Sequence, residues 1–157
     1  MRIELICIEK TKRAEYKSII EDYLKRINKK LNFTIKEIPF NLNKQKKENI
    51  LINQSKLIEK QIKAHDYVVL LDENGKSFSS INFSRWLNLK ISSRDIKCLK
   101  FIMGGAYGLS KKKLEPKINE SISFSKMTFS HQMIRVFVLE QIYRSLKIIN
   151  NEPYHNE

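Results

Sequence analysis

Short apolar segments alternate with amphipathic helical patterns along the whole chain, and this alternation restricts the possible folds more than any other feature. Strands are predicted for residues 2–8, 33–38, 67–71, 98–103 and 118–124. Helices are predicted for residues 13–30, 49–63 and 130–149. A further helix should begin at a cap formed by Ser79 or Ser80, and a short one should lie between Ser110 and Pro116. The pattern therefore predicts a single α/β domain over residues 1–157, with a mostly parallel sheet and flanking helices.

The charge of the chain indicates a polyanionic partner. It carries 30 lysines and arginines against 17 aspartates and glutamates, a net charge of +13, and residues 10–63 hold 15 of the basic side chains but only 6 of the acidic ones. RNA fits such a field because neutralised phosphates release counterions. A lysine-rich surface that only keeps the protein soluble is the alternative, and charge alone does not separate the two.

The N-terminal segment and the cysteines indicate a cytoplasmic protein. Residues 1–8 look like a strand, and no longer apolar run with a cleavage site follows, so we expect neither export nor a membrane span. Cys7 and Cys98 lie in predicted strands and form no C-x-x-C pair, which is typical of core residues in a reducing compartment. No metal site is expected, because the histidines lack ligand spacing: His65, His131 and His155.

All four glycines follow predicted strands. Gly75 comes after the strand 67–71, and the other three come directly after the strand 98–103, at positions 104, 105 and 108. Open α/β sheets bind ligands beyond the carboxyl ends of their strands, so residues 104–108 are a candidate ligand loop. A tight connection is the alternative. The spacing lacks the lysine of a P-loop and departs from Gly-x-Gly-x-x-Gly, which disfavours a nucleoside triphosphate or dinucleotide site.

The predicted helix 130–149 carries apolar side chains nearly all round. Such a helix cannot face water. One side would cover the sheet, and the other side needs a partner, most simply the same helix of a second copy. We therefore expect a homodimer.

Five ordered segments closely resemble the RlmH family of SPOUT-class methyltransferases, and the resemblance spans the whole chain. The segments are Leu-Leu-Asp-Glu-Asn-Gly-Lys at 70–76, Phe-Ile-Met-Gly-Gly-Ala-Tyr-Gly-Leu at 101–109, Ser-Lys-Met-Thr-Phe-Ser-His-Gln at 125–132, Glu-Gln-Ile-Tyr-Arg at 140–144 and Pro-Tyr-His at 153–155. The resemblance implies an S-adenosylmethionine-dependent enzyme that methylates N3 of a pseudouridine in the 23S rRNA of assembled ribosomes. It also implies a homodimer and a trefoil knot in the C-terminal part of the sheet.

The resemblance further implies which residues form the site. The cofactor pocket would be lined by Leu71, Asp72, Gly104, Gly105, Ser125, Lys126, Met127, Thr128, Phe129 and Ser130. Loss of the N3 proton needs a base or a cation that stabilises the developing anion. The catalytic candidates are His131, Arg135, Tyr154 and His155, the last two reaching into the partner's site.

Each catalytic candidate has a structural alternative. His131 would also suit a packing or capping role near a helix start. Arg135, one helical turn further on, would also suit a structural role, although we favour contact with RNA or the cofactor. The chain departs from the family in two places: Ser130 stands where proline is common, and residues 156–157 are Asn-Glu where a basic residue commonly follows the histidine.

Two other functions fit part of the sequence. A SPOUT methyltransferase acting on tRNA would explain both the basic surface and the loops. A non-catalytic ribosome-binding factor would explain the basic surface but would leave the glycine loop and the loop 125–130 without a role.

Overall fold

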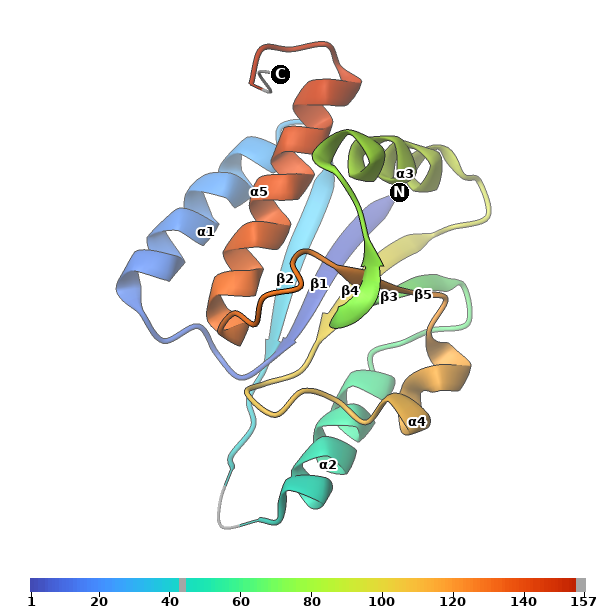
Figure 1. The fold of residues 1–157 in the computed structure, drawn as a ribbon. Helices are drawn as coiled ribbons and strands as arrows, with labels where there is room; N and C mark the ends of the chain where they lie inside the picture. The colour runs from blue at the N-terminus through green and yellow to red at the C-terminus, as the bar shows by residue number, and fades with distance from the viewer. Residues whose placement is uncertain (43–44, 155–157) are drawn as a thin grey trace.

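The structure, a computed structural model, describes residues 1–42 and 45–154 and contains one sheet with helices on both faces (Figure 1). The strands are β1 (Arg2–Ile8), β2 (Asn32–Ile38), β3 (Asp66–Ser77), β4 (Cys98–Met103) and β5 (Glu120–Ser123). The helices are α1 (Ala14–Ile27), α2 (Lys47–Glu59), α3 (Ser80–Ser92), α4 (Lys111–Leu114), the 3₁₀ turn η1 (Glu115–Lys117) and α5 (His131–Ile149).

The sheet has five strands in the order β2-β1-β4-β3-β5, and each of its described pairings is parallel. This confirms the α/β class and the parallel sheet predicted from the alternation of patterns. In the centre of the sheet, Leu5 of β1 lies opposite Ile35 of β2 and Phe101 of β4. The carboxyl ends of the strands consequently meet at one edge, where the loops after β4 and β5 begin.

Alternate residues of β1 enter two separate cores. Ile3, Leu5 and Cys7 pack with residues of α1, α3 and α5. Ile6 and Ile8 point to the other face, where α2 and α4 lie. Figure 1 shows the result as three layers, with α5 between α1 and α3 on one side of the sheet. Both cysteines are buried and free, as predicted.

Side-chain caps fix where two of the helices begin. The Ser79 hydroxyl accepts a hydrogen bond from the Asn82 amide (3.2 Å), which selects Ser79 over Ser80 as the cap of α3. Ser130 caps α5 in the same way by accepting from the Met133 amide (3.3 Å).

Two of the predicted helices, 13–30 and 49–63, end earlier than their apolar patterns suggest. Helix α1 stops at Ile27, and Asn28 then bonds both the amide and the carbonyl of Phe33, which turns the chain into β2. Helix α2 stops at Glu59 rather than at residue 63, and the Asp66 carboxylate closes the following turn by accepting from the Lys63 amide.

Strand β3 differs most from its predicted form. It continues to Ser77, and its register against β5 breaks so that Leu71 and Lys76 both pair with Ile122. Gly75 therefore lies inside the strand and not beyond its end as we expected. A Cβ on Gly75 would lie 2.6 Å from the backbone nitrogen of Ile122, so the absence of a side chain allows this close approach.

The substitution Gly75→Ala should destabilise the protein by about 1–3 kcal/mol, because its methyl group would push two paired backbones apart. The control is Ser77→Ala, an exposed position in the same strand, which should stay within about 0.5 kcal/mol. Urea unfolding monitored by circular dichroism measures both. Equal stability of the two variants would contradict the close approach of β3 to β5.

Candidate active site at the carboxyl edge of the sheet

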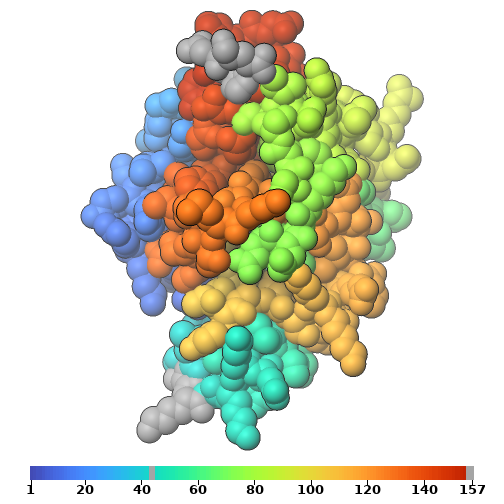
Figure 2. Space-filling model, in the orientation of Figure 1, coloured from blue at the N-terminus to red at the C-terminus, as the bar shows by residue number. Residues whose placement is uncertain are grey.

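Three segments singled out in the sequence lie on one face of the molecule: the middle of β3, the loop after β4 and the loop after β5. Figure 2 shows their green, yellow and orange surfaces adjoining. The Thr128 hydroxyl donates to the Glu73 carboxylate (3.0 Å), which joins the β5 loop to β3. The Lys111 ammonium pairs with Asp72 (2.8 Å), which joins the beginning of α4 to β3.

Asp72 is ionised in this arrangement. Its partial burial opposes the charged form, but the hydrogen bonds from the Lys111 side chain and the Asn74 amide outweigh burial and lower the pKa of Asp72 below its ordinary value. A negative charge is therefore fixed beside the candidate cofactor loops.

The loop 125–130 is exposed and internally ordered. The Ser125 hydroxyl accepts from the Met127 amide (2.9 Å), and the Phe129 ring packs edge-on against Phe137 with centroids 5.0 Å apart. Met127 is 74% exposed. An open hollow of about 430 Å³ separates this loop from β3, and its lining includes Lys126 and Thr128.

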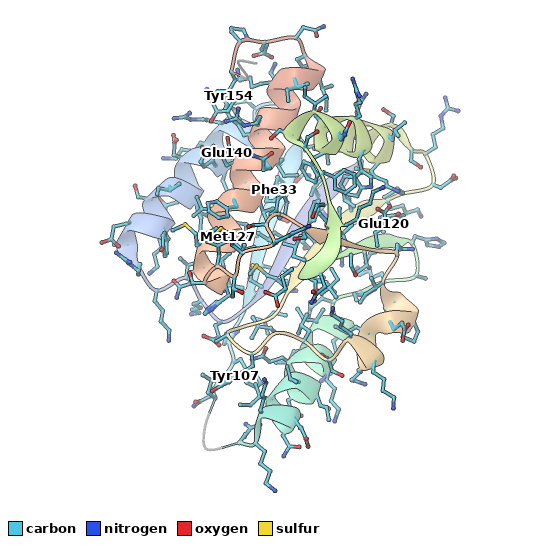
Figure 3. The ribbon with its side chains drawn as sticks, viewed as in Figure 1. Phe33, Tyr107, Glu120, Met127, Glu140 and Tyr154 are labelled. Atoms are coloured by element: carbon cyan, nitrogen blue, oxygen red, sulfur yellow. The ribbon has the colours of Figure 1, made fainter. Side chains whose placement is uncertain are left out.

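The glycine loop is a tight turn, as the alternative reading of the sequence had it. The Gly105 amide donates to the Gln54 side chain (3.1 Å), and the Gly105 carbonyl accepts from the Gly108 amide (3.0 Å). A Cβ on Gly104 would lie 2.5 Å from the Gly108 backbone, and Gly108 has a φ of +82°. The turn leaves Tyr107 about half exposed, at the lower end of the site in Figure 3.

His131 is the first residue of α5 and faces the end of β1. Its Nε2 is buried without a hydrogen bond and lies 3.7 Å from Oε2 of Glu9. Burial lowers the pKa of His131, Arg135 and Lys12 lower it further, and Glu9 opposes them. The imidazole is consequently neutral near pH 7.

Arg135 does not contact the surface, contrary to our expectation of an RNA or cofactor contact. Its side chain is fully buried and donates to the Thr11 hydroxyl (2.8 Å), the Glu37 carboxylate (2.9 Å) and the backbone carbonyls of Ile8 and Glu9 (2.8 and 3.0 Å). A guanidinium held by four protein groups in the interior has a structural role. It ties α5 to the ends of β1 and β2.

The structure does not bring Tyr154 together with His131 within one chain. The Tyr154 ring packs edge-on against Tyr143 (4.9 Å), and the Arg144 guanidinium lies 4.9 Å from its centroid. Tyr143 and Arg144 lie 12 and 13 residues after His131 on α5, which corresponds to about 18–20 Å along the helix axis. Figure 3 shows Tyr154 well apart from Met127 and Tyr107. His155 lies outside the described residues.

Two polar residues of this region were not identified from the sequence. Glu9 is 8% exposed and Gln54 is fully buried, and each has a side-chain atom without a hydrogen bond among the described residues. Two signals could have found them: an acidic residue directly after an apolar strand, and an amide on the apolar side of α2 between Ile50 and Ile58.

Among the described residues, no helix is both long and apolar enough to cross a membrane. The same part of the chain contains no group of three or more histidine, cysteine, aspartate or glutamate side chains placed to hold a metal ion.

Comparison with known proteins defines the class. Residues 1–155 match the family described as predicted SPOUT methyltransferase, and the chain belongs to this family. A solved structure of a probable methylase family protein from Haemophilus influenzae Rd KW20 shares the fold, with a TM-score of 0.58 at 10% identity, covering 99% of this chain and 70% of that one.

Closer relatives narrow the class. The chain is 42% identical to the ribosomal RNA large subunit methyltransferase H of Flavobacterium johnsoniae over 163 residues, covering all of both chains. It is 44% identical to the protein of the same name from Parabacteroides distasonis, again over the full length of both. These relatives confirm the resemblance to the RlmH family.

The substitution Arg135→Met should destabilise the protein by about 3–5 kcal/mol, because it leaves the Glu37 carboxylate and two carbonyls without their buried partner. The control Arg85→Met removes a guanidinium from an exposed position of α3 and should change stability by less than about 0.5 kcal/mol. Thermal and urea unfolding measure both. A small effect at Arg135 would contradict the structural role.

Proposed function

We propose that this chain is an S-adenosylmethionine-dependent methyltransferase that methylates N3 of a pseudouridine in 23S rRNA, acting on assembled ribosomes in the cytoplasm. The observation that carries the proposal is identity above 40% over the whole length of relatives named as large-subunit rRNA methyltransferases. Membership of the SPOUT family supports the same reaction class.

The middle of β3 and the loops after β4 and β5 suit the cofactor. Met127 and Tyr107 present exposed apolar surface in the loops after β5 and β4, which a flat adenine ring can cover, and the segment from Leu71 to Asp72 in β3 supplies backbone groups and a fixed carboxylate. The cofactor would supply a methyl group on a cationic sulfur. Gly104, Gly105 and the stretch from Ser125 to Ser130 form the remaining walls of the proposed pocket.

A trefoil knot fits the course of β3 beside β5. Because Leu71 and Lys76 both pair with Ile122, residues 72–75 form a bulge of β3 opposite β5. Family membership supports a threaded arrangement of this part of the chain. Knots are exceptions to the usual rule that chains do not thread their own loops.

Methyl transfer at a nitrogen is dominated by positioning, and well-oriented reactants can supply about 7–11 kcal/mol of the barrier reduction. The remaining task is to accept the N3 proton. His131 is neutral near pH 7 and lies at the cofactor edge of the sheet, which suits a general base.

A homodimer would complete the site. Met133, Phe137 and Ile148 of α5 remain partly exposed in the single chain, which leaves an apolar surface for a second copy. Antiparallel packing of two α5 helices around a two-fold axis would bring Tyr154 of one chain toward His131 of the other. His155, the next residue in the sequence, would follow Tyr154 there.

The basic surface of α2 and α4 suits RNA phosphates. Lys56 of α2 and Lys112 of α4 are exposed, as are Lys60 directly after α2 and Lys117 at the end of η1. Figure 1 shows α2 and α4 side by side below the sheet. Binding through this surface would be sensitive to salt.

Incubation with methyl-labelled cofactor and, separately, assembled ribosomes, free large subunits and tRNA tests the proposed function. We expect label in 23S rRNA from ribosomes, mapped to N3 of one pseudouridine by mass spectrometry. Label in tRNA would identify the alternative substrate. Absence of both label and cofactor binding in calorimetry would instead favour a non-catalytic ribosome-binding factor.

Mixed dimers test whether two chains build each site. Each variant by itself, His131→Ala or Tyr154→Ala, should be inactive on ribosomes. Co-expressed and purified as a mixed dimer, they should recover turnover, because one of the two sites then receives both intact residues. Light scattering verifies the dimer, and the control mixture of two His131→Ala chains with different tags should stay inactive. An inactive mixed dimer would place both residues in the same chain's site.

A further inference from the structure

Glu9 has a backbone conformation that its own residue type does not favour. It follows β1 directly and has a φ of +68°, in the left-handed region that residues other than glycine rarely adopt. Its amide donates to the Ile38 carbonyl (2.8 Å), and its carbonyl accepts from Arg135 (3.0 Å). Such strained residues cluster at functional sites, so the direction of the side chain matters.

This backbone directs the carboxylate against the glycine loop. A Cβ on Gly105 would lie 2.7 Å from Oε1 of Glu9 and 3.2 Å from Nε2 of Gln54. Both of these atoms are buried, and neither has a hydrogen-bond partner in the described part of the chain. The Glu9 carboxylate is thus 90% buried at the edge where the cofactor loops meet.

His131 faces the other oxygen of this carboxylate. The distance from its Nε2 to Oε2 of Glu9 is 3.7 Å, and Nε2 is buried with no other partner among the described residues. Catalytic hydrogen bonds are often long in ligand-free structures and shorten when the reactants bind. A neutral imidazole has one N–H and one free nitrogen, and an ionised carboxylate only accepts. The pairing therefore favours the proton on Nε2.

We propose that Glu9 is a positioning residue that holds His131 as the Nε2–H tautomer and leaves Nδ1 free to accept the substrate proton. The role of Nδ1 rests on the function proposed above. As the N–H bond of the substrate nitrogen breaks, its electrons form the bond to the methyl carbon, the sulfur–carbon electrons return to sulfur, and the proton passes to Nδ1. The carboxylate then stabilises the imidazolium formed.

Three charged groups act on His131 from the elements packed around it. Glu9 at the end of β1 favours the imidazolium, whereas Lys12 in the following connection and Arg135 on α5 disfavour it. Of these three groups, Glu9 alone raises the pKa of His131, so removal of its charge should lower that pKa further. A neutral His131 accepts protons, so the acid limb of the rate profile should move to lower pH.

Nitrogen-15 NMR of the histidine rings tests the inference. The chain has three histidines, and His131→Gln assigns the signal of interest. In the wild-type protein we expect the Nε2–H tautomer. Glu9→Gln keeps the shape but offers a donor as well as an acceptor, so it should give mixed tautomers. The matched control Glu59→Gln, a partly exposed α2 carboxylate paired with Lys113, should leave the His131 signals unchanged.

Kinetics with ribosomes supply the second readout. Glu9→Gln should lower kcat by about tenfold, less than the roughly 10²–10⁴-fold lost with a general base itself, and should leave the KM for the cofactor nearly unchanged. Glu9→Asp retains the charge and should retain the tautomer and most of the turnover.

The outcomes separate this inference from the proposed function. An Nδ1–H tautomer of His131 in the wild-type protein would overturn the inference, whether or not the Glu9 variants fold. Unchanged tautomer and pKa in a folded Glu9→Gln variant would overturn it equally. A wild-type protein that shows the Nε2–H tautomer but methylates no RNA would instead contradict the proposed function and leave the Glu9–His131 pairing intact.

Discussion

The buried guanidinium of Arg135 is the interaction on which the site depends. It joins α5 to the carbonyls of Ile8 and Glu9 and, through Glu37, to the end of β2. Two of its hydrogen bonds end on the backbone that places Glu9 in its left-handed conformation. His131 lies one helical turn before Arg135, so the same contact fixes the distance between the His131 ring and the Glu9 carboxylate. A buried cation with one paired carboxylate is therefore best understood as a positional constraint and not as a source of net stability.

The part of the fold that depends on local periodicity could be predicted from the sequence. The order of strands and helices along the chain, the parallel sheet and a helix cap at Ser79 or Ser80 follow from apolar spacing and from side-chain chemistry within a few residues. The register break in β3 could not be predicted, because it depends on pairing with Ile122, which is far away in sequence. Gly75 was recognised as a residue near the end of the predicted strand 67–71, but the sequence did not show that the strand continues through it.

For the candidate site too, features that depend on local sequence could be predicted, and features that depend on distant contacts could not. The loops 104–108 and 125–130 could be found because glycines and hydroxyl residues cluster after predicted strands, whereas Leu71 and Asp72 were assigned to the site only through the resemblance to the RlmH family. The structural role of Arg135 was only the less favoured of two alternatives, because the sequence does not show its partners Thr11 and Glu37, which are 124 and 98 residues away. Glu9 was missed for a related reason: an acidic residue at a strand end is ordinary, and only the tertiary structure shows that its carboxylate is buried against Gly105.

The candidate catalytic residues His131 and Tyr154 lie in different surroundings along α5. His131 at the beginning of the helix is held by interior contacts that a single chain completes. The Tyr154 ring packs on Tyr143 and Arg144, which lie 12 and 13 residues after His131 and therefore about 18–20 Å along the helix axis. If both residues act on one substrate, two copies of the chain are the simplest way to bring them together. In the function proposed above, His131 and Glu9 would supply the proton chemistry from the interior of one chain, and association of two chains would supply the other half of the site.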